Sequence, residues 1–208
     1  MGKFIDLSWD IFDNMAVYPS DDPVKLHQDK FLEKDGYNYF QLEIGLHAGT
    51  HIDTPMHMLN DKTFISGVPL DRFTGKGCLL DVRGERVIGF KQEYADTVSE
   101  NDIVILFTGY RDEYRTEAYF MNHPVVGEDL ANFLVEKRIK MLGMDLPSPD
   151  RYPFGIHKKL LKNNILLIEN LTNLAELVNV KSFTIYAFPL KIRADASIAR
   201  VVAYIDMT

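Results

Sequence analysis

The 208-residue sequence has one cysteine, no long hydrophobic run and no basic cluster, and each of these absences excludes a class of protein. With Cys78 alone, no disulfide can form within the chain. No stretch approaches the roughly 20 apolar residues of a membrane-spanning helix, and the N-terminus lacks a signal-peptide run, so we expect a cytoplasmic protein without membrane contact. A formal charge of -7 without a Lys/Arg stripe argues against nucleic acid as a partner.

Motifs of several common enzyme mechanisms are also missing. The sequence has no Gly-x-Ser-x-Gly nucleophile elbow, no phosphate-binding loop and no His-Glu-x-x-His pair. Gly75-Lys76-Gly77 lacks the third glycine and the following helix of a dinucleotide-binding fingerprint. Cys78 follows directly in an apolar run, which predicts a small buried residue and not a nucleophile. These absences favour a mechanism that uses neither a serine nor a cysteine nucleophile.

The chain length fits one domain that includes residues 1–208. A chain of this size buries about 70% of its unfolded surface, so it needs no disulfide or structural metal to fold. Short apolar runs such as Ile103–Phe107 alternate with amphipathic segments such as 127–138, which predicts a mixed α/β domain. No internal repeat or low-complexity linker divides the chain.

The stretch from Leu46 to His57 holds three of the six histidines together with an aspartate. The three histidines and the aspartate all occupy odd-numbered positions: His47, His51, Asp53 and His57. An extended backbone sends alternate side chains to one face, so all four could line one wall. Residues 40–46 alternate apolar with polar or small side chains, as in a half-buried strand. We therefore expect a strand that runs into a loop, with the polar groups along one face.

This cluster of side chains predicts a metal site. Neutral imidazoles and a carboxylate suit zinc, manganese or iron better than calcium or magnesium. A helix would also bring His47 and His51 together, but Gly49 and Pro55 disfavour a helix here. A lone histidine is more often a core or surface residue, and four candidate ligands within eleven residues reverse that judgement.

The pattern His-x-Gly-Thr-His-x-Asp-x-Pro-x-His over residues 47–57 resembles the signature of the cyclase family of metal-dependent hydrolases. That family includes bacterial kynurenine formamidase and isatin hydrolase. Further resemblance covers nearly the whole chain, including the loop 143–148 and a degraded form of the family's Gly-Ala-Asp-Gly-Ser-Pro turn at 193–198. The resemblance implies a single-domain, mixed-sheet α/β fold of swivelling β/β/α architecture. It also implies a homodimer or homotetramer with exchanged N-terminal arms.

The resemblance further implies a set of ligands for two divalent metal ions, Zn²⁺ or Mn²⁺. The ions would be held by His47, His51 and Asp53 on one metal, His157 on the second, and Asp53 with Glu169 bridging both. Glu169 also follows the apolar run 165–168, and a buried carboxylate is costly unless it is paired or bound to a metal. His57 lies outside this set, and we expect it to act as the general acid/base because imidazoles transfer protons near neutral pH.

Such a site suits hydrolysis of a carbon–nitrogen amide bond. Two cations about 3.5 to 4 Å apart can polarise a carbonyl, and they lower the pKa of bound water to about 7. The substrate that the resemblance implies is N-formylkynurenine, which is cleaved to kynurenine and formate in tryptophan catabolism. The alternatives are another cyclic amide, a lactone or an ester as substrate, or a metal-binding protein without turnover.

The sequence allows two possible roles for a few further residues. Tyr18 and Tyr110 stand where family members carry Trp, and Tyr18 either contacts the substrate or packs at a turn. Asp145 and Ser148 either orient the metal ligands or cap a turn. His123 is expected at the surface.

Overall fold

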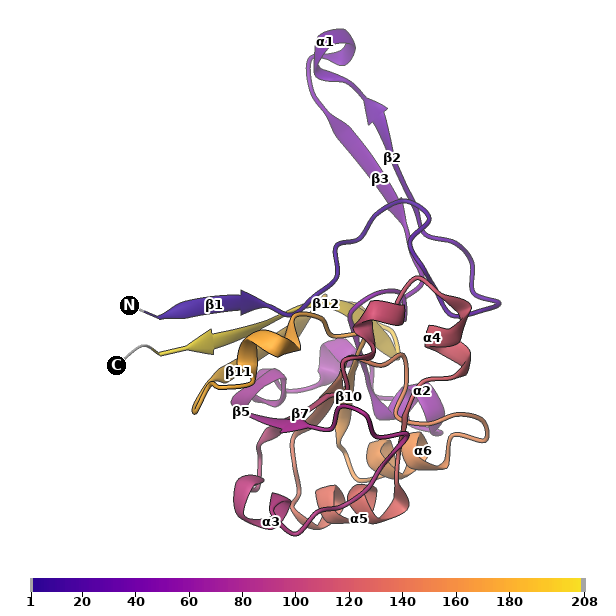
Figure 1. Ribbon diagram of the computed structural model, residues 1–208. Helices are drawn as coiled ribbons and strands as arrows, with labels where there is room; N and C mark the ends of the chain where they lie inside the picture. The colour runs from indigo at the N-terminus through magenta and orange to yellow at the C-terminus, as the bar shows by residue number, and fades with distance from the viewer. Residues whose placement is uncertain (1, 207–208) are drawn as a thin grey trace.

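The computed structural model describes residues 2–206, and its central element is an eight-stranded mixed sheet (Figure 1). The strand order is β1-β12-β11-β5-β7-β9-β10-β4, and β4 also pairs with the start of β12, so the sheet closes on itself. The strands are β1 (Lys3–Asp6), β4 (His51–Asp53), β5 (Thr74–Asp81), β7 (Ile103–Phe107), β9 (Met141–Met144), β10 (Leu166–Glu169), β11 (Thr184–Pro189) and β12 (Ala196–Ile205). Strands β5, β7, β9 and β10 run parallel, and the other pairs are antiparallel.

Helices cover the outer face of the parallel strands, in the lower part of Figure 1. They are α3 (Tyr94–Thr97), α5 (Glu128–Glu136) and α6 (Gly155–Lys162). The apolar side chains of α5 and α6, such as Leu130, Leu134 and Leu160, are fully buried against β5, β7 and β9. The helix predicted for 127–138 is therefore confirmed as α5, because its apolar stripe matches the helical period.

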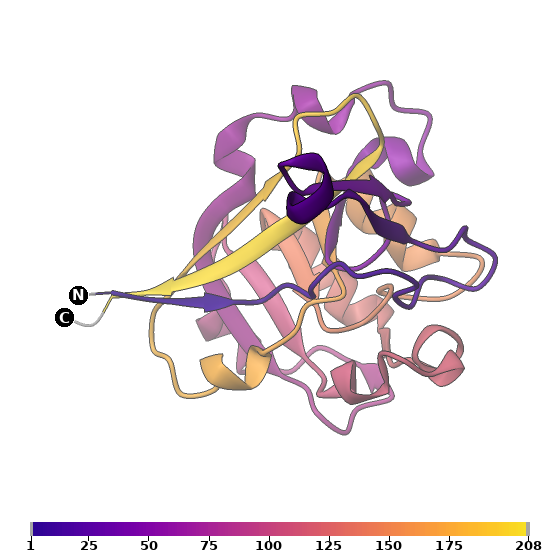
Figure 2. The ribbon, with the colours of Figure 1, turned by 90° about the horizontal axis from the view of Figure 1, so that it is seen from above.

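Figure 2 shows the curved sheet from above. A second core contains buried side chains from β4, β7 and β10. Ile52, Ile105 and Ile168 contribute to it from three different strands and are fully buried. Gly143 lies where strands approach closely, since a Cβ there would be 2.6 Å from Ile105 Cδ1. A larger residue at this position would push neighbouring side chains apart.

The remaining elements are short. They are α2 (Pro55–Met58), α4 (Glu117–Met121), the paired strands β6 (Val87–Ile88) and β8 (Val125–Val126), and the 3-10 turns Ile65–Gly67, Leu70–Phe73, Tyr110–Glu113 and Leu174–Leu177. Among residues 2–206, no helix has the length and apolar character needed to cross a membrane. Cys78 is buried, and burial raises the pKa of its thiol to about 11, which confirms the prediction for this residue.

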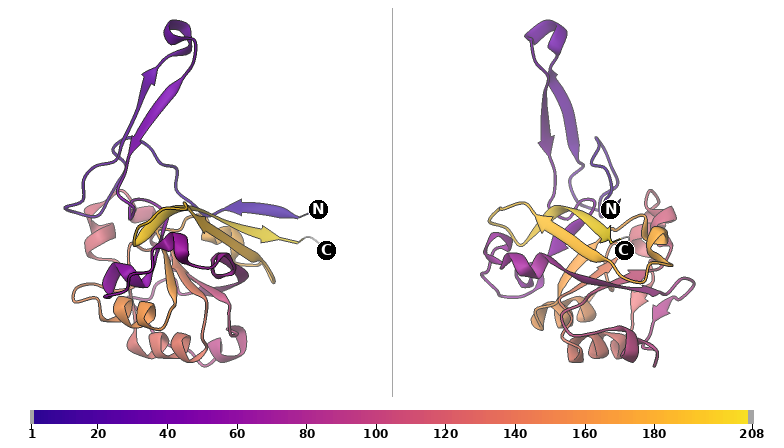
Figure 3. Two further views of the ribbon diagram at one scale, coloured as in Figure 1. Left: turned by 180° about the vertical axis from the view of Figure 1, so that it is seen from behind. Right: turned by 90° about the vertical axis from the view of Figure 1, so that its left-hand side faces the viewer.

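A hairpin, which we call the arm (residues 25–43), stands away from the body of the molecule (Figures 1 and 3). It consists of β2 (Lys25–Lys30), α1 (Leu32–Asp35) at its tip and β3 (Tyr39–Glu43). The strand predicted over 40–46 is confirmed in part as β3, but the prediction of a half-buried face is wrong. The strand ends at Glu43 and every residue in it is exposed, with Phe40 at 57% and Leu42 at 46%.

His123 is buried, contrary to the surface position expected for it. It is 2% exposed, and its Nδ1 donates a hydrogen bond to the Pro124 carbonyl at 2.8 Å. Burial lowers the pKa of His123 to about 4, and the charge of Arg151 acts in the same direction, although the bond to Pro124 opposes both. The folded chain therefore requires the neutral imidazole.

The stability that His123 contributes is expected to disappear in mild acid. The unfolded state, with an imidazole pKa near 6.5, binds more protons than the folded state between pH 6.5 and 4. The contribution is thus fully present above pH 6.5 and is lost as the pH falls toward 4, by up to about 3 kcal/mol. The measurement is urea unfolding of the wild type and His123→Asn at pH 7 and 4.5. The difference in the free energy of unfolding between the two proteins reports on His123, because the other titrating groups contribute equally to both. If the wild type exceeds His123→Asn in the free energy of unfolding by as much at pH 4.5 as at pH 7, the prediction for His123 is wrong.

Candidate metal centre

The predicted site residues meet where β4 runs between β10 and β12. The pairing of β4 with β10 places His51 directly opposite Glu169. Asp53, two residues further along β4, points to the same side of the strand, as the alternation of an extended backbone requires. His157 lies in the first turn of α6, which packs against α2 and β10. The short strand therefore supplies the two central groups, and its neighbours supply the others.

His47 and His57 reach the site from outside the strand, so the predicted wall of one extended segment is wrong. The chain turns before β4, where Gly49 has a φ of +62°, and Pro55 begins the helix α2 that carries His57. The two rings nevertheless lie close together, with 4.2 Å between their centroids. The side chains converge because the turn and the helix fold back over β4.

Asp53 is the centre of the cluster and is fully buried. Its Oδ1 lies 2.9 Å from His47 Nδ1, and its Oδ2 lies 3.2 Å from His157 Nε2. His57 is further away, with its Nε2 3.9 Å from Asp53 Oδ2. Burial alone would raise the pKa of Asp53, but the charges and hydrogen bonds of the surrounding histidines hold it well below its ordinary value. The carboxylate is therefore ionised.

The buried carboxylates in turn raise the pKa of the histidines. Burial lowers the pKa of His47, but its close contact with Asp53 at 2.9 Å and the charges of Asp53 and Asp195 outweigh burial and raise the pKa to about 9. The pKa values of His51 and His157 are also raised, again against the effect of burial. A cation competes with these protons for the same nitrogen lone pairs, so the site has the charge to hold one.

Three buried atoms at this point make no hydrogen bond of good geometry to any residue in 2–206. They are His51 Nε2, Asp53 Oδ1 and Glu169 Oε1. His51 Nε2 lies 3.3 Å from Glu169 Oε2 and 3.5 Å from Asp53 Oδ1. Unsatisfied polar atoms are rare in protein interiors because each costs about 1 to 3 kcal/mol. A shared cation would satisfy all three atoms, so the residues fit a divalent metal with nitrogen and oxygen ligands.

The donor atoms form two overlapping groups, each with all its atoms within 4.8 Å of one another. One group is His51, Asp53 and Glu169, and the other is His47, Asp53 and His57. Asp53 belongs to both. His57, expected to lie outside the ligand set, is thus close enough to be a ligand itself.

A chain of hydrogen bonds fixes the ring of His51. Its Nδ1 donates to the Gly49 carbonyl at 2.8 Å, which leaves Nε2 with a free lone pair toward Glu169. The same carbonyl accepts a bond from Asn170 Nδ2 at 2.9 Å, and Asn170 is held by the Tyr119 hydroxyl at 2.8 Å. Such partners behind a metal ligand select its tautomer and orientation.

Of the two loop residues for which the sequence allowed two roles, one contacts a predicted ligand and one caps a turn. Ser148 Oγ lies 3.3 Å from His157 Nδ1, on the ring edge opposite Asp53. Asp145 instead accepts hydrogen bonds from the backbone and hydroxyl of Thr108 and from the Gly109 backbone, at 2.7 to 2.9 Å. Ser148 therefore belongs to the site, and Asp145 holds the turn after β7.

Asp195 is a member of the cluster that the sequence did not identify as a functional residue. Its Oδ2 lies 3.2 Å from His47 Nε2 and 3.1 Å from His57 Nδ1. Burial acts to raise the pKa of Asp195, but the hydrogen bond from His57 and the charge of His47 lower it below the ordinary value. The one available signal was the position of Asp195 in the turn 193–198, which resembles a family motif.

A cavity of about 250 Å³ opens onto the cluster. Besides the histidines and Glu169, it is lined by Tyr18, Asp21, Met58, Phe120, Pro147, Ser148, Phe154 and Asn170. Tyr18 is 41% exposed. Its ring and that of Phe120 pack edge to face, with 6.0 Å between their centroids. Tyr110 is not part of this lining and stacks on Tyr119 instead. The cavity therefore offers aromatic and apolar walls next to a polar floor.

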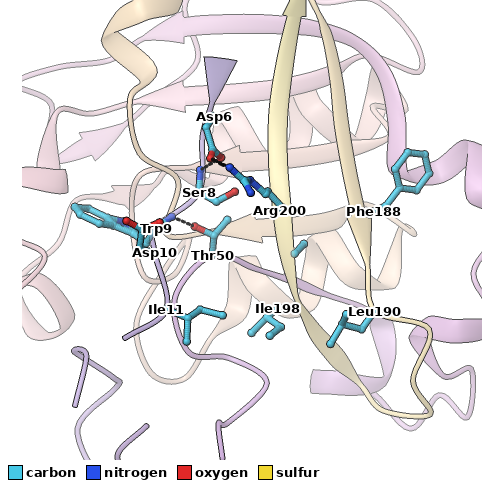
Figure 4. Close-up of a pocket in the computed structure, with 11 residues that line it drawn as sticks. Asp6, Ser8, Trp9, Asp10, Ile11, Thr50, Phe188, Leu190, Ile198 and Arg200 are labelled. Carbon is cyan, nitrogen blue, oxygen red and sulfur yellow. Dashed lines mark hydrogen bonds and ion pairs between the residues drawn. The ribbon is translucent and has the colours of Figure 1, made fainter. Parts of the chain in front are cut away.

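A second hollow, of about 400 Å³, lies between the segment 8–11 and the strands β11 and β12 (Figure 4). Of its three charged side chains, Asp6 and Arg200 are paired with each other at 2.7 Å and Asp10 is the third, and its lining contains no histidine. Phe188 and Leu190 on its rim are 45% and 52% exposed. This hollow thus combines an ion pair with exposed apolar side chains, and none of the predicted site residues line it.

Known proteins similar to this chain include enzymes. The family model described as "Putative cyclase" matches residues 5–151. Kynurenine formamidase from Bacillus cereus is 29% identical in an alignment of 205 residues that covers 96% of each chain. A structure described as a predicted metal-dependent hydrolase from Bacillus stearothermophilus is 28% identical over 98% of each chain, with a TM-score of 0.79. Isatin hydrolase A from Ralstonia solanacearum is 17% identical, with a TM-score of 0.86 over 99% of this chain and 92% of its own. The predicted α/β fold class is confirmed by this shared fold.

Proposed function

Because the chain belongs to the cyclase family, we propose that it is a metal-dependent hydrolase that cleaves the amide bond of N-formylkynurenine to give kynurenine and formate. The observation that carries this proposal is the convergence of unpaired buried atoms of His51, Asp53 and Glu169 beside an apolar cavity. The whole-length similarity to a kynurenine formamidase supports the choice of substrate.

The proposed ligands form two sets that share Asp53. Two divalent ions, Zn²⁺ or Mn²⁺, would be held by His47, His51 and Asp53 on one side and His157 on the other, with Asp53 and Glu169 shared. The two oxygens of Asp53 face different histidines, Oδ1 toward His47 and Oδ2 toward His157, as a bridging carboxylate requires. When bound, such ions supply an acidified water and polarise a substrate carbonyl.

His57 is placed to move the proton in this reaction. Its Nδ1 is held by Asp195, and the ring lines the cavity with 23% of the side chain exposed. The oxygen of water adds to the formyl carbon and the carbon–nitrogen bond breaks. His57 takes the proton from that water and gives it to the leaving arylamine nitrogen, and formate is released.

The aromatic part of the substrate would lie against the apolar walls of the cavity. Tyr18, Phe120 and Phe154 present rings there, and Met58 adds a flexible apolar contact. Tyr18 is thus proposed to contact the substrate from the open side of the cavity.

The experiment that tests this function uses the metal-free protein reconstituted separately with zinc and manganese. We expect hydrolysis of N-formylkynurenine only by the metal-loaded forms. Isatin, a simple lactone and an aryl ester are assayed in parallel. Turnover of one of these without turnover of the formamide would reassign the substrate, and metal binding without any turnover would leave a metal-binding protein.

We further propose that the chain assembles with copies of itself, as a homodimer or homotetramer. The arm exposes large apolar side chains: Phe31, Leu32, Tyr37, Tyr39, Phe40 and Leu42. An isolated two-stranded hairpin is at best marginally stable in water, and apolar patches of this kind mark interaction sites. Phe188 and Leu190 at the hollow in Figure 4 form a second exposed apolar surface. In a two-fold symmetric dimer, the arm of each copy would pack against this surface of the other copy, so that both copies bury both surfaces.

The double variant Phe40→Asp/Leu42→Asp is expected to be monomeric, because it places two charges in the proposed contact. Light scattering after size-exclusion chromatography measures the mass, and we expect at least twice the chain mass for the wild type. Glu33→Gln, at the exposed tip of the arm, serves as the control and should not change the mass. A monomeric wild type would contradict the assembly.

A further inference from the structure

We propose that Asp195 is a positioning residue whose single carboxylate sets the rings of two histidines, His57 and the metal ligand His47. The inference rests on the proposed function for the roles of these histidines. It goes beyond that function because it assigns a task to a residue that is neither a ligand nor a proton carrier.

The backbone holds Asp195 rigidly against the helix that carries His57. The Asp195 carbonyl accepts hydrogen bonds from the Thr54 backbone at 3.1 Å and from its hydroxyl at 2.7 Å. Thr54 immediately precedes α2, and the next residue after Asp195, Ala196, pairs with Asp53. The carboxylate is therefore fixed relative to both β4 and α2 before any metal or substrate binds.

The geometry of the carboxylate selects one tautomer for each ring. An ionised carboxylate only accepts hydrogen bonds, so both imidazoles must donate to it. His57 donates through Nδ1 at 3.1 Å, which leaves the lone pair on Nε2, the atom that accepts a proton in the proposed reaction. His47 donates through Nε2 at 3.2 Å, so a bound metal would take the lone pair of Nδ1, the atom beside Asp53, whereas without a metal Nδ1 carries a proton toward Asp53. One oxygen thus sets complementary tautomers in neighbouring rings.

No other role accounts for this carboxylate. Its side chain is 34% exposed, and within residues 2–206 no lysine or arginine nitrogen lies within ion-pair distance of it. Its two imidazole contacts come from segments 138 and 148 residues away in the sequence. A carboxylate behind a metal-bound imidazole typically changes metal affinity 10- to 100-fold, and one behind a catalytic imidazole governs its tautomer.

The test compares Asp195→Asn with wild type, using Asp112→Asn as the matched control because Asp112 is exposed and lines no part of the cavity. Asparagine keeps the shape but can donate as well as accept, so the tautomers are no longer fixed. At saturating zinc we expect kcat to fall about 10²- to 10⁴-fold with KM changed less than about threefold. Zinc affinity, measured against a competing chelator, should fall about 10- to 100-fold.

The decisive readout is the tautomer of each ring, observed by NMR with ¹⁵N-labelled histidine in the zinc-loaded protein. We expect His57 protonated on Nδ1 in the wild type and in the control, and a mixture that includes the Nε2-protonated form in Asp195→Asn. Unchanged tautomers, or a kcat within twofold of wild type, would overturn the proposal. If the wild type itself does not hydrolyse the formamide, the proposed function fails, while the tautomer and affinity measurements still decide the role of Asp195.

Discussion

His57→Ala is expected to lower kcat for amide hydrolysis about 10²- to 10⁴-fold while the protein keeps its bound metal, because the variant loses the proton carrier. His57 is the histidine of the cluster furthest from Asp53, at 3.9 Å, and its other ring nitrogen is occupied by Asp195. Turnover and metal content are measured on the same preparations.

His27→Ala is the matched control, since His27 lies on the exposed arm and lines no part of the cavity. It should match wild type in both measurements. Loss of metal together with activity in His57→Ala would make His57 a ligand, as its grouping with His47 and Asp53 permits. Full activity with full metal content would remove His57 from the mechanism.

Asp53→Asn is expected to abolish both metal binding and activity. The carboxylate is fully buried, contacts histidines through both oxygens and belongs to both groups of donor atoms. Its loss leaves the surrounding imidazoles without their counter-charge, so the free energy of unfolding should fall by about 3 to 5 kcal/mol. Metal affinity should fall by more than the roughly 100-fold typical of residues behind the ligands.

Asp102→Asn separates this effect from the general cost of neutralising a buried carboxylate. Asp102 is 3% exposed and lies near Lys76, away from the metal cluster. This control should lose stability and keep its metal. Metal content is measured by elemental analysis and stability by urea unfolding. An Asp53→Asn variant that binds metal as tightly as wild type would contradict the assignment of the centre.

The sequence predicted the central part of the site for a sound physical reason. His51 and Asp53 lie two residues apart on a strand, so the alternation of side chains places them together. Glu169 ends a buried strand and needed a partner, which the pairing of β10 with β4 supplies. Local periodicity and the cost of buried charge indicated that each of these residues needs a polar partner, and the resemblance to the cyclase family alone implied that Glu169 is a metal ligand.

His47 and His57 were expected to lie beside Asp53, and they do, but the backbone conformation predicted for them is wrong. The odd-numbered spacing suggested one extended wall, but Gly49 adopts a left-handed conformation and Pro55 starts a helix. The alternation of Phe40 and Leu42 predicted a strand, and β3 is a strand. Alternation of apolar and polar residues indicates that a strand has an apolar face. It does not show whether that face packs against the rest of the chain, so the exposed arm could not be predicted.

Residues brought together over long distances gave no local signal. Asp195 reaches His57 only because the sheet closes through β12 and β4, across 138 residues of sequence. His123 ends a polar and aromatic segment without another histidine, and its burial depends on segments that pack around it from elsewhere, including Arg151. Closure of a sheet and burial of single polar residues are properties of the tertiary fold.

The most direct test of the central claim is a titration of the metal-free chain with Zn²⁺ while hydrolysis of N-formylkynurenine is followed. If the cluster around Asp53 is the catalytic metal centre, the rate rises with bound zinc and levels off at about two equivalents per chain. Hydrolysis by the metal-free chain at the same rate, or a chain that retains no zinc, would contradict it.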